Sequence, residues 1–103
     1  MEYVNLTPHD IQLNDGTCYK ASGIVARVFT TFSKFDENKI AKIIFGEIEN
    51  LPSPKTNTIY IVSSLVAQAV KGREDVVSPA TGHPGAIRSN GNIISVPGFV
   101  RIN

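Results

Sequence analysis

The stretch TIYIVSSLVAQAVKGREDVVSP, residues 58–79, decides the fold. Residues 58–62 form an apolar, partly β-branched run that is typical of a strand. A short amphipathic helix is predicted directly after it, over about residues 64–71. Its apolar face consists of Leu65, Val66, Ala69 and Val70. Gly72 is well placed to end this helix in the left-handed conformation, and extended chain resumes at about residue 75.

Two hairpins are predicted on either side of this stretch. Asn14-Asp15-Gly16 separates alternating residues 11–13 from residues 17–20, and Asn90-Gly91 lies between Ile87 and Ile93. Both are turn sequences that antiparallel hairpins prefer. Each pair of flanking segments is therefore expected to run antiparallel.

The remaining apolar segments also favour strands. Residues 24–32 are rich in Val, Phe and Thr. Residues 39–45 fit either a helical turn or a strand, and the alternation that follows Gly46 favours a strand pair. Residues 99–100 are expected to dock as a final edge strand. The chain, residues 1–103, is therefore predicted to be a single compact α+β domain, a mostly antiparallel β-sheet with one short α-helix packed on it.

Composition excludes several functional classes. Hydrophobic residues make up 42% of the chain and charged residues 18%, as in a compact globule. A net charge of +1 does not supply the broad basic surface that general nucleic-acid binding needs. No apolar run is long enough to span a membrane, and the start MEYVNLT lacks the features of a signal peptide. We expect no membrane association and a location in the cytoplasm.

The lone cysteine and the two histidines give little support for catalysis or metal binding. Cys18 has no partner for an internal disulfide, and in a hairpin strand it is expected to be a buried thiol. His9 and His83 each lie beside a proline and are best interpreted as turn residues. No HExxH motif or paired histidine motif is present, so neither a metal nor another cofactor is expected. An acid/base pair of His9 and Asp10 stays open as an alternative.

The predicted helix N-terminus is the best candidate for a binding site. A strand that leads straight into a helix exposes the first free N–H groups of that helix at the end of a sheet, where a phosphate or carboxylate can bind. Ser63 and Ser64 can contact such an anion through their hydroxyls, and either can equally cap the helix. No acidic residue in the first turn competes for those N–H groups.

Other polar residues could complete such a site. Arg73 follows the helix and could add a forked cation, or could pair with Asp75 instead. Arg27 places a charge inside an apolar strand, where it either faces solvent or lines a pocket. Arg88 follows the flexible loop SPATGHPGA, which could close over a ligand. The candidate ligand-binding residues are Ser63, Ser64, Arg73, Arg27, Arg88, Asn5, Thr7 and His9.

Aromatic and aliphatic residues suggest two further roles. Tyr3, Tyr19, Tyr60 and Phe99 could stack on a base, although core packing is the commoner role of such residues. The apolar runs 43–45 and 93–94 need more cover than one short helix provides. A homo-oligomer, a dimer or a small even-numbered ring, is therefore expected.

Five segments together resemble a family of small, uncharacterised proteins of bacteria, phages and prophages. They are NLTPHDI, SGIVARV, GEIENLPSP, residues 58–79 and IRSNGNIISVPGF. The resemblance covers nearly the whole chain in the same order, and it implies no particular activity and no catalytic residues. The phage association suggests an analogy with small phage sponges, which sequester the nucleotide signals of bacterial immunity. If a phage encodes the chain, the expected location is the cytoplasm of its bacterial host.

Three functional hypotheses follow from these patterns. The first is a protein that captures a phosphorylated, nucleotide-like small molecule without turnover, as a phage anti-defence sponge would. The second is a small enzyme, a hydrolase, that acts on a similar ligand with His9 or His83 as the acid/base. The third is a module that binds a phage or host protein through its surface. Binding without turnover is favoured over an enzyme.

Overall fold

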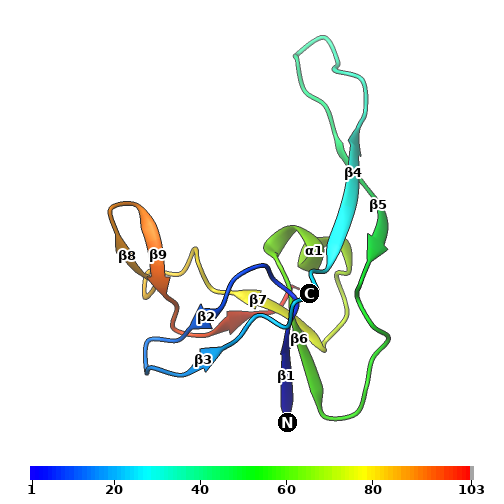
Figure 1. Cartoon of the computed structure of the whole chain (residues 1–103). Helices are drawn as coiled ribbons and strands as arrows, with labels where there is room; N and C mark the ends of the chain where they lie inside the picture. Colours follow the sequence, from blue (N-terminus) through cyan, green and yellow to red (C-terminus); the bar gives the residue numbers. More distant parts are fainter. Residues whose placement is uncertain (103) are drawn as a thin grey trace.

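A mixed β-sheet lies at the centre of the molecule in the computed structural model, which describes residues 1–102 (Figure 1). Within those residues the chain forms ten strands and one helix. In chain order they are β1 (Glu2–Asn5), β2 (Ile11–Gln12), β3 (Cys18–Tyr19), β4 (Arg27–Phe32), β5 (Ile43–Glu49), β6 (Thr58–Ile61), α1 (Ser64–Ala69), β7 (Val76–Pro79), β8 (Ile87–Ser89), β9 (Asn92–Ser95) and β10 (Phe99–Val100). The central sheet has the strand order β1-β6-β7-β10.

Three of the four central strands are parallel. β1 pairs with β6 and β6 pairs with β7 in parallel, whereas β10 is antiparallel to β7. Because α1 carries the chain from β6 to β7, the second strand starts again at the same end of the sheet as the first. The predicted α+β class with one short helix is confirmed. The prediction of a mostly antiparallel sheet is wrong for the central sheet, since antiparallel pairs form only small hairpins and its β10 edge.

Side chains that alternate along β6 and β7 fill a core on each face of the sheet. Tyr60 and Val76 point to the face that α1 covers, and Ile61 and Val77 point to the opposite face. The first core contains Leu6, Ala26, Tyr60, Val62, Val66, Ala67 and Val76. The second contains Ile11, Ile61, Val77 and Val96. Both faces of the parallel strands are therefore covered, as is usual for parallel pairing.

Helix α1 is shorter than the sequence predicts. It ends at Ala69, with Val70 as its C-cap, and Gly72 follows with a φ of 101°. The left-handed Gly72 is confirmed, because only glycine adopts this conformation at little cost. The buried positions are Val66 and Ala67, whereas Leu65, expected on the apolar face, is 40% exposed.

Both predicted hairpin turns are confirmed. β2 pairs with β3 around Asn14-Asp15-Gly16, and β8 pairs with β9 around Asn90-Gly91. Asn90 and Gly91 have φ values of 52° and 82°, and a two-residue turn of type I′ needs positive φ at both positions. Cys18 in β3 is exposed, so the prediction of a buried thiol is wrong. The body of the protein covers only one face of the short strand β3, and Cys18 lies on the other face.

The β4–β5 hairpin projects from the body as an arm, which we define as residues 27–49 (Figure 1). A radius of gyration of 15.2 Å exceeds the about 13 Å typical of a compact domain of this length. The strand alternative for residues 39–45 is confirmed in part, because β5 spans residues 43–49, runs through Gly46 as one strand and pairs with β4. The strands of the arm contain a bulge where Gly46 faces Phe29, and a Cβ on Gly46 would lie 3.1 Å from the Phe29 carbonyl oxygen.

No helix within residues 1–102 is long and apolar enough to cross a membrane.

Candidate functional site

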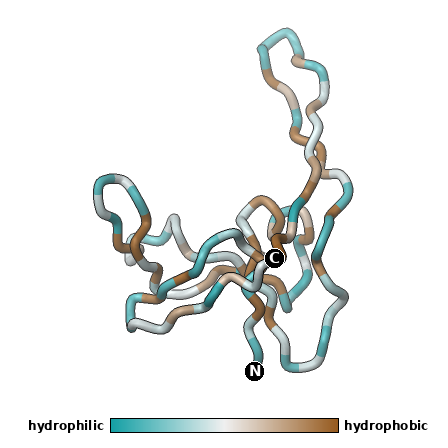
Figure 2. The backbone as a smooth tube through the Cα atoms, viewed as in Figure 1, coloured by the Kyte–Doolittle hydropathy of each residue, from teal (hydrophilic) through white to brown (hydrophobic). Residues whose placement is uncertain are grey.

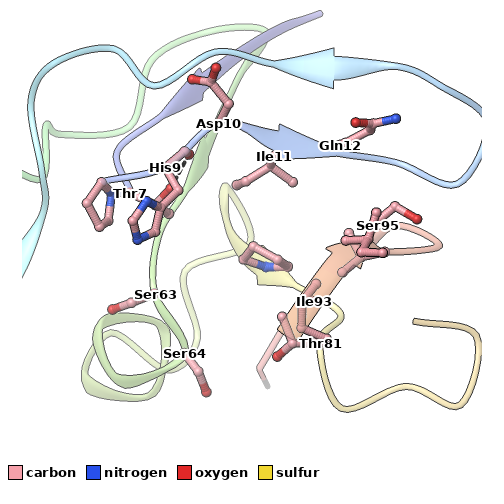
Figure 3. Close-up of a pocket in the computed structure, with 14 residues that line it drawn as sticks. Thr7, His9, Asp10, Ile11, Gln12, Ser63, Ser64, Thr81, Ile93 and Ser95 are labelled. Carbon is pink, nitrogen blue, oxygen red and sulfur yellow. Dashed lines mark hydrogen bonds between the residues drawn. The ribbon is translucent and has the colours of Figure 1, made fainter. Parts of the chain in front are cut away.

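A cleft of about 390 Å³ opens where the three parallel strands end (Figure 3). The segment after β1, the first residues after β6 and Thr81 just beyond β7 all reach it, because parallel strands have their carboxyl ends at one edge of the sheet. β9 forms the remaining wall. The lining residues are Thr7, Pro8, His9, Asp10, Ile11, Gln12, Ser63, Ser64, Pro79, Thr81, Ile93, Ile94, Ser95 and Val96.

Asn5 holds the segment after β1 in place. Its side-chain Nδ2 donates to the carbonyl oxygens of His9 and Tyr19, at 2.8 and 3.0 Å. Its Oδ1 accepts from the Thr7 backbone N–H at 2.9 Å and from the Thr7 hydroxyl at 2.7 Å. The amide group of Asn5 thus makes all four of its possible bonds within the protein, and the residue is only 2% exposed. The sequence predicts Asn5 and Thr7 as ligand contacts. However, the side-chain hydrogen-bonding groups of Asn5 are all used within the protein, and those of Thr7 are partly used.

His9 and Asp10 extend along the cleft wall with different orientations. His9 is exposed and its ring lies on the side of the cleft near Ser63, whereas the Asp10 carboxylate points away from the cleft (Figure 3). The Ala21 backbone N–H donates to Asp10 Oδ1 at 2.8 Å, and Lys20 Nζ lies 3.3 Å from Oδ2. These contacts, the Ala21 bond first, hold the pKa of Asp10 below its ordinary value. Because the Asp10 carboxylate is held by Ala21 and Lys20 and points away from the cleft, it is poorly placed for acid/base chemistry with His9.

The helix N-terminus lies open to the cleft. Ser63 is the N-cap, and its hydroxyl accepts from the Val66 N–H at 3.4 Å. The Ser64 hydroxyl accepts from Gln68 Nε2 at 3.2 Å. Both serines are exposed and both line the cleft. The interpretation of Ser63 as a cap is confirmed, and contact of either serine with a ligand stays a prediction.

None of the three candidate arginines lines the cleft. Arg73 Nε donates to Asp75 Oδ1 at 3.0 Å, and its Nη2 donates to Asp75 Oδ2 at 2.6 Å and to the Pro52 carbonyl at 3.0 Å. Arg73 is therefore fixed beyond the C-terminal end of α1, by the pairing with Asp75 that the sequence leaves open. Arg27 is exposed and borders a neighbouring groove. Arg88 is nearest to the site, because its Nη2 donates at 2.7 Å to the carbonyl of Thr81, a lining residue.

The β9 wall is the part of the site that sequence reasoning misses. Ile93, Ile94 and Ser95 reach the cleft because the chain after β9 joins the end of β2. The Val96 N–H donates to the Gln12 carbonyl at 3.0 Å, and the Ser95 hydroxyl donates to Asn14 Oδ1 at 2.7 Å. The Asn90-Gly91 turn predicts the hairpin itself. No local signal in the sequence tells that its second strand lies beside residues 80 positions earlier.

The other candidate residues lie in structural positions. The His83 ring Nδ1 accepts from the Gly85 N–H at 2.9 Å, as expected of a turn residue. Tyr3, Tyr19 and Phe99 pack together with ring centroids 5.1 to 6.1 Å apart, and Tyr60 is a core residue. Within residues 1–102, no group of three or more His, Cys, Asp or Glu side chains is placed to hold a metal ion.

Comparison of the chain with protein-family models, with curated proteins and with solved structures gives no match. The function is therefore argued from the cleft and its chemistry.

The arginine pair gives a stability prediction. Arg73→Ala is expected to lower the free energy of unfolding by roughly 1–2 kcal/mol, because a bidentate ion pair and a carbonyl bond are lost at side chains only 25% and 17% exposed. Ligand binding in the cleft should not change. Urea denaturation checks this, with Lys20→Ala as the control, since Lys20 and Asp10 form an exposed pair that water and salt screen and that is expected to contribute little. Equal effects of the two substitutions would contradict the assignment.

Proposed function

We propose that the protein captures a small phosphorylated, nucleotide-like molecule in this cleft and releases it unchanged. The observation that carries the proposal is the position of the cleft, at the carboxyl ends of β1, β6 and β7 and at the start of α1. In sheets with parallel strands, this edge is where ligands bind. A volume of about 390 Å³ lies in the range of small-molecule sites.

The two sides of the cleft differ in chemistry, which suits a ligand with one flat and one anionic part. Ile11, Ile93 and Ile94 supply apolar surface against which a base or ribose can pack. Ser63 and Ser64 supply hydroxyls and the first N–H groups of α1, and His9 adds a ring beside them. Since α1 has only six residues, these N–H groups act as local donors rather than through a long helix dipole.

The charge of the cleft limits the ligand to a single phosphate. Its lining, within residues 1–102, contains Asp10 but neither lysine nor arginine. Arg88 and Lys20 each contact a lining residue, at the Thr81 carbonyl and the Asp10 carboxylate, and either would have to leave that partner to reach a phosphate. A polyphosphate would carry more negative charge than this lining can offset.

Capture is favoured over hydrolysis because the one acid/base pair in the cleft is poorly arranged. His9 has Asp10 as its neighbour, and the Asp10 carboxylate is held by the Ala21 N–H and by Lys20, away from the cleft. The resemblance to small phage proteins agrees with a sponge that withholds a nucleotide immune signal. This role as a sponge is part of the proposal.

A retention experiment tests the proposal. The purified protein is incubated separately with a nucleoside monophosphate, ADP-ribose and a cyclic dinucleotide, then desalted, denatured and analysed by mass spectrometry. Release of the intact nucleoside monophosphate is expected, whereas ADP-ribose and the cyclic dinucleotide, which carry two phosphates each, should be retained less. A converted product would support a hydrolase, and no retention of any compound would overturn the proposal.

A charge substitution tests where the phosphate binds. Ser64→Glu is expected to weaken binding of the retained compound roughly tenfold or more, because a carboxylate then competes for the N–H groups at the start of α1. Thermal stability should stay equal or rise slightly, since the first turn of α1 has no acidic residue and a glutamate there is favourable. Ser53→Glu, at an exposed serine outside the cleft, adds the same charge and should leave binding unchanged. Equal binding by both variants would place the phosphate elsewhere.

A further inference from the structure

The arm has an apolar face that begins in the core and continues out of the body. Residues opposite one another in an antiparallel pair lie on the same face. Val28 faces Ile48, Thr30 faces Phe45 and Phe32 faces Ile43. We call these six residues the arm face. Val28 and Ile48 pack against the first core, whereas Phe32 is 67% and Ile43 46% exposed.

The tip of the arm is held by its own hydrogen bonds and carries two exposed apolar side chains among polar and charged residues. Asp36 Oδ1 accepts from the N–H groups of Asn38 and Ile40, at 2.8 and 3.0 Å. Ser33 and Lys42 continue the pairing of the strands beyond β4 and β5. This turn presents Phe35 and Ile40, which are 71% and 62% exposed. Figure 2 shows the end of the arm as mostly hydrophilic, with hydrophobic positions along the strands below it.

The arm face and the tip leave apolar surface for a partner to cover. Phe32 and Ile43 on the arm face and Phe35 and Ile40 at the tip are 46–71% exposed. Phe29 and Ile44 are 55% and 49% exposed on the opposite face of the arm, because Thr31 faces Ile44 and successive strand residues alternate between faces. An isolated two-stranded hairpin is only marginally stable in water, so a cover would also stabilise the arm.

An apolar groove at the base of the arm offers a place for the tip of another arm. It measures about 480 Å³ and lies between the start of β4 and α1, and Val28 of the arm face is among its lining residues. Its apolar lining includes Leu6, Pro8, Val25, Val28, Leu65 and Val66. Leu65, which the sequence places on the buried face of the helix, is 40% exposed here.

We propose that two copies of the chain dimerise through their arms, which lie antiparallel and face to face, with the tip of each arm in the basal groove of the other. This arrangement fixes the register of the two arms. Thr30 is five residues from Phe35 at the tip and five from Val25 at the groove, about 17 Å each way in extended chain. A two-fold axis near Thr30 therefore brings Phe35 of one copy to Val25 of the other.

The distribution of charged residues along the arm favours an antiparallel arrangement of two arms. The outer part, residues 33–42, has three lysines against two acidic residues, and the inner part has Arg27 against Glu47 and Glu49. The outer part is thus net positive and the inner part net negative, so each meets the opposite charge in the antiparallel pair. A lipid surface fits less well, because Asp36 and Glu37 at the turn would have to enter it with Phe35.

Sedimentation velocity on the full chain, from 1 to 100 μM, tests the dimer. We expect a species of twice the 11.2 kDa chain mass at the upper concentrations. Phe32→Glu should give a monomer with an unchanged circular dichroism spectrum, whereas Ile87→Glu, at an isoleucine in β8 that is 47% exposed and remote from the arm and its groove, should leave the dimer intact. A monomer throughout, or a dimer that Phe32→Glu does not change, would overturn the proposal. Monomers that bind anionic phosphatidylserine vesicles through Phe32 would overturn it as well.

Disulfide trapping tests the register of the dimer. In a Cys18→Ser background, the double variant Val25→Cys and Phe35→Cys should form a covalent dimer on mild oxidation. Ten residues of extended chain separate the two positions within one copy, roughly 33 Å, which exceeds the reach of a disulfide. Each single variant should stay largely monomeric on a denaturing gel. Absence of the covalent dimer from the double variant, while the protein sediments as a dimer, would overturn this arrangement.

Discussion

Replacing Asn5 with alanine is expected to lower the free energy of unfolding by about 2–4 kcal/mol, a large part of the stability of a small domain. The substitution removes the donor to the His9 and Tyr19 carbonyls and the acceptor of the Thr7 N–H. These groups lie in a part-buried or buried setting, where unpaired polar groups are costly. Urea denaturation followed by circular dichroism measures the change.

Two variants show whether the hydrogen bonds of Asn5 cause this loss. Asn38→Ala, at an exposed asparagine in the arm, should change the free energy of unfolding by less than about 0.5 kcal/mol. Asn5→Asp keeps the acceptor for Thr7 but loses both donations and buries a charge, so it should destabilise at least as much as alanine at pH 7. An Asn5→Ala protein as stable as the unmodified chain would contradict the assigned role.

Ile61→Ala is expected to cost about 3–5 kcal/mol of unfolding free energy, the upper part of the range for removing a buried isoleucine. Ile61 is fully buried on β6, between two paired strands, and it is central to the second core. The surrounding backbone is held by ladder bonds on both sides and cannot close over the cavity. Ile24→Ala makes the same change at an isoleucine that is 55% exposed, and should cost under about 1 kcal/mol. Similar losses in the two variants would contradict the assigned core.

The sequence predicts well those structural features that depend only on residues close to one another in the chain. Asn90-Gly91 needs only its own two positive φ values to make a turn, and Ser63 needs only the N–H of Val66 to cap the helix. The pairing of Arg73 with Asp75 is local too, and it keeps Arg73 from a distant anion. In each case, the partner lies within three residues.

Features that join distant segments escape prediction. β1 pairs with β6 across more than 50 residues, and alternation along a strand does not tell whether its neighbour is parallel or antiparallel. The sequence predicts that Ser63 and Ser64 begin a helix at the end of a strand. β1 also ends at this edge and brings Thr7 and His9 to the same cleft. This arrangement depends on the long-range pairing of β1 with β6.

The exposure of Cys18 and the projection of the arm have a common cause. Short hairpins have two faces, and the sequence pattern does not tell which one the body covers. In β3, Tyr19 packs inward and Cys18 faces solvent. In the arm, Val28 reaches the core while Phe32, four residues later on the same face, lies beyond it.

Amide chemical shifts in ¹⁵N-labelled protein test the binding site most directly. The protein is titrated with adenosine 5′-monophosphate, and with inorganic phosphate as a separate probe for the anion alone. The account predicts saturable shifts with adenosine 5′-monophosphate at the residues around the cleft, above all His9, Ser64, Thr81 and Ile94. Phosphate alone should move mainly Ser64 and its neighbours. Shifts confined to the Arg73–Asp75 pair or to the arm, or no saturable shifts with either probe, would contradict it.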